Sequence, residues 1–268
     1  MILILTLVAV AAAANSREQL DYNKQDQWGG SCQTGRAQSP IDVPFPSAVE
    51  LASPPFLHLS RGSFNMTNEN HPDTAKFSVN PAEGSVMATV PWMKDRQVTL
   101  HQIHLHWGET AAHGSEHTIM GKAYAAEIHL VTSYIDKDSS TKYMVFTRLF
   151  RAGKKENKHI AEIIAAEKRE GNNRNIQNFD MESLYPPYTA VWTTYKGGLT
   201  TPPCTEVVQF AIVDEPLVVT KRQLKKLRRM SLGAGDLAPQ RQNWRKTQPL
   251  NGRTSTKYYR GRDIEVQF

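Results

Sequence analysis

The chain has 268 residues, of which 40% are hydrophobic and 22% charged, and its net charge is +6 at pH 7. This composition is typical of a soluble globular protein and excludes a disordered or fibrous chain. The length allows one large domain or two ordinary ones. No internal repeat or linker divides the sequence, so we expect one folded domain.

The first 14 residues, MILILTLVAVAAAA, form the only long apolar run. The run is too short to cross a bilayer and ends in small residues, as the apolar region and cleavage site of a signal peptide do. We therefore expect a signal peptide over residues 1–14, a mature domain over residues 15–268, and a secreted, extracellular protein with no membrane span. The alternative is a plain apolar N-terminal strand. The C-terminal residues RDIEVQF carry no apolar tail, so we expect no lipid anchor there.

The two cysteines, Cys32 and Cys204, make an even count in a chain that is expected to enter an oxidising compartment. A disulfide between them would close most of the domain into one loop, worth about 4–5 kcal/mol in the chain-entropy model. The alternative is two separate buried thiols. Asn65-Met66-Thr67 is the only N-glycosylation sequon, so Asn65 is a candidate glycosylation site.

Strands dominate the predicted elements. Residues 15–60 are rich in Gly, Pro, Ser and Asn and are predicted to form loops and short turns. Short segments of β character follow, separated by turn residues. They read AKFSV (75–79), SVMATV (85–90), VTLHQIHLHW (98–107), AAEIHLVTSY (125–134) and KYMVFTRLF (142–150).

Fewer helices and strands are predicted after residue 150. Residues 161–169 have helical composition, and GNN at 171–173 is predicted to end that helix. Two more strands, YTAVWTTY (188–195) and EVVQFAIV (206–213), are joined by KGGLTTPPCT. The sequence thus predicts a mainly β (α+β) domain with a few short peripheral helices.

The densest basic stretch is KRQLKKLRR, residues 221–229. Leu224 and Leu227 are three residues apart, which indicates an amphipathic helix with a solvated basic face. Contact with extracellular polyanions through residues 221–229 is the alternative. No aromatic residue interleaves with the basic ones, so nucleic-acid binding has no support.

Three of the nine histidines fall within six residues, in HQIHLHWG (101–108). A lone histidine in a strand is more often solvated or hydrogen-bonded than a metal ligand. However, His104 and His106 are two apart, and that spacing places both rings on one face of a strand. His129 follows 23 residues after His106. Three neutral imidazoles without a fourth protein ligand are typical of a catalytic Zn²⁺ site with an open position for water.

The histidine ligands also have candidate partners. Gln102 and Glu127 each lie two residues before a ligand, on the ligand's own face, where they can hold its second ring nitrogen. Zinc bound in this way lowers the pKa of its water to about 7, which gives hydroxide at neutral pH. A peptide-cleaving zinc hydrolase is less consistent with the sequence, because no H-E-x-x-H helix is present.

Five motifs in order resemble the α-class carbonic anhydrases of the secreted, disulfide-containing type. They read AQSPIDV (37–43), HQIHLHWG (101–108), GSEHT (114–118), YAAEIHLV (124–131) and GGLTTPPCTE (197–206). The likeness runs from about Tyr22 to the end of the chain. It implies a single domain on a large twisted, mostly antiparallel central sheet, with zinc at the base of a conical cleft. It also implies reversible hydration of CO₂ to bicarbonate and a proton, and inhibition by sulfonamides.

The resemblance also implies residue roles. By motif position, His104, His106 and His129 resemble the family's zinc ligands. Thr200 resembles the threonine whose hydroxyl accepts from zinc-bound hydroxide and donates to a glutamate, here Glu116. That pair would orient the hydroxide toward CO₂, a positioning role.

Further positions follow from the same resemblance. Val131, Val145 and Leu199 match the apolar CO₂ pocket, and Thr201 lines the same wall. Cys32 and Cys204 match the cysteine pair of the secreted members, which supports a disulfide.

Two departures from the family pattern concern the pocket and the proton shuttle. Phe210, in QFAIVDEP, replaces a tryptophan. The shuttle loop reads NENHPDTAKFSV (68–79), with Asn70 for glycine. If Pro72-Asp73 is an insertion, His71 takes the shuttle position, but an alignment without a gap places Asp73 there. We favour His71, because a histidine titrates near neutral pH and a carboxyl group of ordinary pKa, about 4, does not.

The alternative function belongs to another class. It is a catalytically reduced carbonic-anhydrase-like domain retained as an extracellular binding, storage or matrix protein. Such relatives usually lose zinc-binding histidines, whereas this chain has all three.

Overall fold

The computed structural model describes residues 19–44, 47–51, 58–59, 62–90, 93–167, 174–185, 191–230 and 241–260. The signal peptide predicted over residues 1–14 lies outside the described residues. The helices, in chain order, are η1 (Gln25–Gln27), α1 (Ser31–Thr34), α2 (Lys158–Ala166), η2 (Glu182–Leu184) and α3 (Lys221–Leu227). The strands are β1 (Asp42–Val43), β2 (Ser47–Leu51), β3 (His58–Leu59), β4 (Ser63–Asn68), β5 (Lys76–Val79), β6 (Ser85–Val90), β7 (Met93–Trp107), β8 (Thr118–Ile119), β9 (Ala126–Ile135), β10 (Thr141–Gly153), β11 (Ile176–Asp180), β12 (Trp192–Gly197), β13 (Val208–Thr220) and β14 (Thr256–Arg260).

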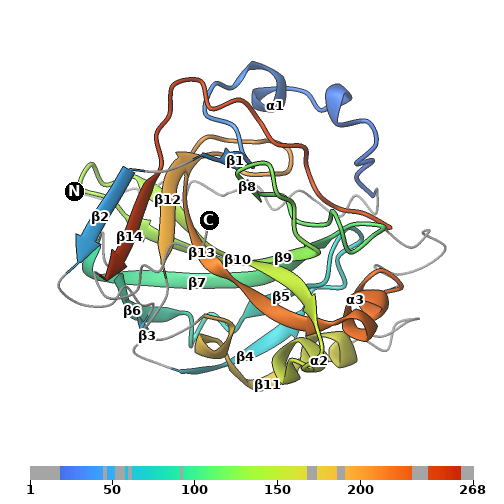
Figure 1. Cartoon of the computed structure of the whole chain (residues 1–268). Coiled ribbons are helices and arrows are strands. Elements are labelled where there is room, and N and C mark those ends of the chain that lie inside the picture. Colours follow the sequence, from blue (N-terminus) through green and yellow to red (C-terminus); the bar gives the residue numbers. More distant parts are fainter. Residues whose placement is uncertain are drawn as a thin grey trace, which may run out of the picture.

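One large sheet organises the described residues. Its strands follow the order β11-β4-β5-β7-β9-β10-β13-β12-β14-β2, and β6 pairs with both β7 and β3. Neighbours are antiparallel except for β10 with β13 and β14 with β2. Figure 1 shows the twist of this sheet, from the upright strands β2, β14 and β12 to β7, which runs across the centre of the view. The predicted fold class is therefore confirmed.

The predicted strands between residues 75 and 150 correspond to β5, β6, β7, β9 and β10. The predicted pair after residue 188 corresponds to β12 and β13. Their long apolar runs have the pattern of strands that are covered on both faces. Within the described residues, no helix is long and apolar enough to cross a membrane.

The prediction of loops and short turns throughout residues 15–60 was wrong for β2. This five-residue strand pairs in parallel with β14, about two hundred positions later in the chain. Its Pro-rich surroundings indicate turns, and within the described part of the chain its paired strand is the distant β14. The five residues of β2 are therefore too short a segment to indicate a strand from their own sequence.

Helix α2 begins earlier than the predicted range of 161–169. The side chain of Asn157 accepts hydrogen bonds from the N–H groups of His159 and Ile160, and so caps the helix at Lys158. The GNN sequence expected to end the helix lies outside the described residues. The helix predicted in the basic stretch is confirmed as α3, with Leu224 and Leu227 buried.

Two apolar clusters pack on opposite faces of the central strands. Consecutive residues of β10, Val145 and Phe146, belong to different clusters, because side chains alternate between faces along a strand. In β9, Leu130 belongs to the larger cluster, together with residues of α2 and α3. His129 therefore points to the opposite face, where the smaller cluster around Val145 and Phe210 lies.

Candidate metal centre

Strands β7 and β9 bring three histidines together. Their antiparallel register sets His104 directly opposite His129, and His106 lies two residues further along β7. The three ring centroids are 4.8 to 5.0 Å apart. One nitrogen from each ring lies within 4.8 Å of the other two. The sequence predicted these three histidines as one set of ligands, and the structure brings them together.

Each of the three rings meets a hydrogen-bond acceptor through one nitrogen. The pairs are His104 Nδ1 with Gln102 Oε1 at 2.9 Å, His106 Nδ1 with the Asn243 carbonyl at 2.6 Å, and His129 Nε2 with Glu127 Oε1 at 2.6 Å. These contacts fix the tautomers and leave the second nitrogens turned toward one another. His129 Nδ1 and His104 Nε2 are 3.2 Å apart. Gln102 and Glu127 therefore lie where the sequence placed them.

The three histidine rings favour the neutral form, which is the form that can bind a metal ion. Burial lowers the pKa of all three histidines, and that of His106 falls to about 3. Neutral imidazole is the form that binds a metal ion. Among the described residues, buried His106 Nε2 has no hydrogen-bond partner, and Glu116 Oε2, at 3.3 Å, has none either. Buried polar atoms are rarely unpaired, and three inward imidazole nitrogens fit tetrahedral Zn²⁺ with one open position.

Glu127 organises a buried polar network behind this centre. Its Oε1 lies 2.6 Å from Nδ1 of His117, and its Oε2 accepts from the His117 backbone N–H at 2.8 Å. His117 Nε2 lies 2.6 Å from the Tyr195 hydroxyl, which donates to Ser39 Oγ. Burial alone would raise the pKa of Glu127, but His117 and the hydrogen bonds from both histidines hold it well below its usual range. Ionised Glu127 is therefore a strong acceptor for His129.

A second group of potential metal ligands, His117, Glu127 and His129, shares this region. Its polar atoms already bond to one another, so the hydrogen bonds satisfy the group without an ion. The triad His104, His106 and His129 is the better candidate for a metal centre.

Glu116 and Thr200 lie together beside the histidines. Glu116 is fully buried and its Oε1 accepts from the backbone N–H of Arg245 at 3.0 Å. Burial and the charge of Glu127 raise the pKa of Glu116 well above its usual range, although the Arg245 N–H and the neighbouring Thr200 side chain act in the opposite direction. The structure thus places Thr200 against Glu116, as the resemblance implies.

The predicted disulfide joins Cys32 to Cys204, whose Cα atoms are 5.0 Å apart. The Cys204 N–H donates to the carbonyl of Thr201 at 2.9 Å. The disulfide therefore anchors the loop that carries Thr200 and partly exposed Thr201.

The predicted pocket residues share one apolar wall. Val131, Val145 and Leu199 pack in the same cluster as Phe210. Val145 in β10 is paired with Val131 in the neighbouring strand β9 and with Phe210 in the neighbouring strand β13. The Phe210 ring lies 6.0 Å from that of His129, so this wall borders the metal centre.

The shuttle candidates occupy the loop before β5. His71 Nδ1 accepts from the backbone N–H of Asp73 at 3.2 Å and lies 3.9 Å from its Oδ2. The His71 side chain is 36% exposed, that of Asp73 only 6%. Burial and the charge of Lys76 lower the pKa of His71 to about 4, while burial raises that of Asp73 to about 6. The pKa values thus reverse the order that we expected from the sequence.

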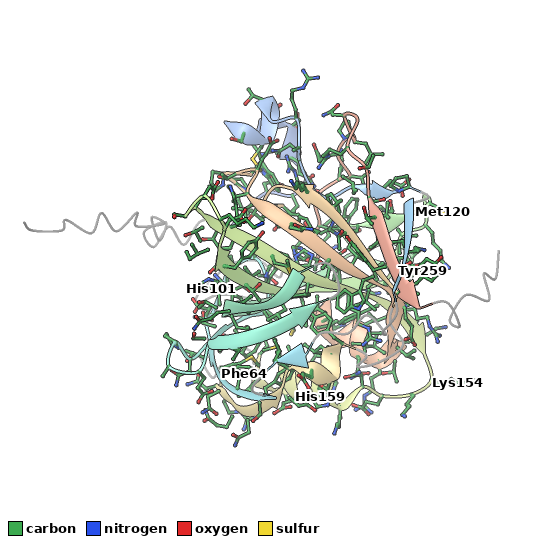
Figure 2. All side chains as sticks on the ribbon, turned by 90° about the vertical axis from the view of Figure 1, so that its left-hand side faces the viewer. Phe64, His101, Met120, Lys154, His159 and Tyr259 are labelled. Carbon is green, nitrogen blue, oxygen red and sulfur yellow. A yellow bond between two sulfur atoms is a disulfide. The ribbon has the colours of Figure 1, made fainter. Side chains whose placement is uncertain are left out.

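Asn65 and His101 have other surroundings. Asn65 is half-buried in β4, where its Nδ2 donates to Glu83 and its Oδ1 accepts from the backbone N–H of Asn178. Its glycosylation stays a prediction. His101 is exposed and lies 2.7 Å from Ser133 Oγ. Figure 2 shows it toward the opposite side of the molecule from Met120.

Sequence reasoning missed four residues of the centre. His117 and Ser39 lie within the motifs GSEHT and AQSPIDV, whose pattern alone does not indicate their contacts with Glu127 and Tyr195. The position of Tyr195 beside His117 depends on the register between β12 and β13, which the sequence does not show. Asn243 had no sequence signal, because its contribution to the histidines is a backbone carbonyl.

Comparisons with known proteins agree with this geometry. The family model for eukaryotic-type carbonic anhydrase matches residues 23–259. The chain is 30% identical to bovine carbonic anhydrase 3 over 87% of this chain and 94% of the bovine protein. It is 31% identical to a putative carbonic anhydrase 5 of Caenorhabditis elegans, over 94% of this chain and 86% of the other. Horse carbonic anhydrase 3 is 37% identical over 58% of this chain, a stretch that spans 63% of the horse protein. The chain therefore belongs to the eukaryotic-type carbonic anhydrase family.

Proposed function

We propose that the protein is an active zinc enzyme that catalyses the reversible hydration of CO₂ to bicarbonate and a proton. One observation carries the proposal: the inward nitrogens of His104, His106 and His129 converge beside an apolar wall. These three residues would hold the ion. When bound, Zn²⁺ would supply a nucleophile at neutral pH by lowering the pKa of water to about 7.

Thr200 and Glu116 would orient the attacking oxygen. A threonine hydroxyl has a single proton to donate. If Thr200 donates that proton to the Glu116 carboxylate, its oxygen can only accept a hydrogen bond from the attacking group. This selects one orientation of the attacking oxygen, and the gain is one of positioning.

The apolar wall would hold CO₂, which carries no net charge and no hydrogen-bond donor. Val131, Val145 and Leu199 offer it a surface without competing polar groups. Phe210 continues that surface beside His129. Water is a poor competitor on such a wall, because an apolar surface gives it no hydrogen bonds.

Proton removal would use the loop that carries His71 and Asp73. The exposure of His71 favours that residue as the relay, because a relay must pass its proton to buffer. The pKa of about 6 favours Asp73, because it lies closer to neutral pH. We keep His71 as the proposed relay and Asp73 as the rival.

Secretion is also proposed. A disulfide forms and persists in oxidising compartments, and the apolar leader is typical of a signal peptide. The Cys32–Cys204 bond supports this location.

The test is stopped-flow CO₂ hydration on purified protein of known zinc content. We expect about one zinc per chain, since three imidazoles and one water complete the tetrahedral shell. Removal of zinc by a chelator should abolish hydration, and an aromatic sulfonamide should inhibit it. If zinc-loaded protein does not raise the rate of CO₂ hydration above the uncatalysed rate in the same buffer, the proposal is contradicted. A non-catalytic binding, storage or matrix protein would then be favoured.

A further inference from the structure

One face of α3 carries only cations. Arg222, Lys225 and Lys226 are exposed and spaced three or four residues apart, so they lie on the same side of the helix. Arg229, exposed in the turn that follows α3, continues the row of cations. The opposite side is buried through Gln223, Leu224 and Leu227. One face of α3 thus packs against the protein, and the cationic face is exposed to solvent.

That cationic face borders a hollow of about 570 Å³ between α2 and α3. Figure 1 shows the two helices side by side at one end of the sheet. The lining residues are Ile164, Glu167, Arg222, Lys225, Lys226, Arg229 and Met230. None of them belongs to the metal centre.

The hollow has an excess of positive charge. Among the described residues, none of its four cations forms an ion pair with a carboxylate. Glu167, the one acid among the described lining residues, is 5% exposed, and its Oε2 accepts from Asn68 Nδ2 in β4 at 2.8 Å. The carboxyl group is therefore engaged with the sheet and leaves the cations uncompensated.

Helix stability does not account for this charge pattern. Like charges four residues apart on a helix repel, and Arg222 and Lys226 have that spacing in α3. Lys225 and Lys226 suit the negative end of the helix dipole. Arg222 lies in the first turn, where a cation is unfavourable. A bound anion would relieve the repulsion.

We propose that this hollow binds a sulfated polysaccharide. Sulfate groups keep their charge at neutral pH, and an extended chain can present several of them to the four cations along α3 and the turn after it. The guanidinium groups of Arg222 and Arg229 can form paired hydrogen bonds with such oxyanions. The binding is independent of zinc and of the proposed catalysis.

Other polyanionic partners fit less well. Among the residues that the structure describes, the lining has no aromatic side chain on which nucleic-acid bases could stack. A membrane-binding surface needs exposed apolar residues beside its cations, and Met120 and Ile135, the large exposed apolar residues of the described chain, lie outside this lining. Protein interfaces are depleted in lysine, whereas this lining holds two.

Heparin is the probe, and the test compares two pairs of substitutions that remove the same charge. Lys225→Gln with Lys226→Gln alters the hollow, while Lys137→Gln with Lys246→Gln removes two exposed cations elsewhere. At 0.15 M NaCl the first pair should weaken heparin binding about tenfold and reduce the salt slope of log K by about 2. The control pair should stay within about twofold of wild type.

Thermal unfolding and CO₂ hydration should be unchanged in both variants, which separates loss of binding from loss of the fold. Equal weakening by both pairs would overturn the proposal, because it would show general attraction to net charge. No effect of the first pair would overturn it as well. Duplex DNA or phosphatidylserine vesicles binding as tightly as heparin at equal ionic strength would contradict the assignment to a sulfated polysaccharide.

Discussion

His106 Nδ1 donates to the backbone carbonyl of Asn243 over 2.6 Å, although the two residues are 137 positions apart. The Asn243 side chain holds that carbonyl in place. Its Oδ1 accepts from the Trp107 N–H at 2.6 Å, and its Nδ2 donates to the carbonyls of Asp73 and Leu105. A fully buried amide thus sets the tautomer of a candidate metal ligand from outside the histidine triad.

Replacement of Asn243 by Ala should weaken zinc binding about 10- to 100-fold, because the acceptor for His106 loses its support. The free energy of unfolding should also fall by about 1–3 kcal/mol, since buried backbone groups lose their partners. Competition with a chelator measures the first effect and thermal denaturation the second. Gln242→Ala is the control, because Gln242 bonds to Asn23 near the surface. Wild-type zinc affinity in Asn243→Ala would disprove the supporting role.

The metal assignment predicts a contrast between two histidines of β7. His106→Ala should abolish most zinc binding and CO₂ hydration together, because it removes one of three ligands. His101→Ala should leave both unchanged, since that ring is exposed and contacts Ser133. For both variants, mass spectrometry under native conditions measures the zinc content and stopped-flow kinetics measures CO₂ hydration. Full zinc occupancy in His106→Ala would refute the centre.

Local sequence patterns predicted the parts of the site that depend on strand periodicity. His104 and His106 share a face because they are two residues apart, and Gln102 lies on that face for the same reason. The face itself could not be chosen from β7 alone. Leu105 and Ile103 are buried in the larger cluster, and this packing directs the histidines to the opposite side.

Contacts that depend on distant segments could not be predicted in the same way. Asn243 acts through its backbone, which leaves no mark on residue type. β2 is defined by its pairing with β14. The pKa order of His71 and Asp73 depends on burial by the fold and on neighbours such as Lys76, which ordinary side-chain values do not include.

The disulfide should contribute strongly to stability. Cys32 and Cys204 are separated by 172 positions, and closing a loop of this size stabilises the folded state by about 5 kcal/mol in the chain-entropy model. The double variant Cys32→Ser with Cys204→Ser should therefore unfold at a lower temperature. Its turnover should also fall, because the Thr200 loop loses its anchor. Reduced wild-type protein should behave like the variant. Two free thiols in native secreted protein would contradict the prediction.

Glu167 should make stability depend on pH. Burial raises its pKa to about 7 in the folded state, from an ordinary value of 4.5. Between these values the folded state binds more protons than the unfolded state, so the free energy of unfolding should fall by about 3 kcal/mol as pH rises. Glu167→Gln should remove this loss and be more stable than wild type at pH 8, as chemical denaturation would show. Glu162→Gln, on the exposed side of α2, should keep the wild-type profile. Identical profiles for all three proteins would contradict the shift.

The proton relay can be assigned by comparing His71→Ala with Asp73→Asn. If His71 is the relay, its loss should lower CO₂ hydration turnover severalfold in dilute buffer with zinc content unchanged, because only proton export slows. Added imidazole should restore most of the loss. Asp73→Asn should then have little effect, since the His71 ring remains exposed to buffer. The opposite outcome, a severalfold loss confined to Asp73→Asn, would assign the relay to the carboxyl group whose pKa is about 6. Wild-type turnover in both variants would show that buffer removes the proton without either residue.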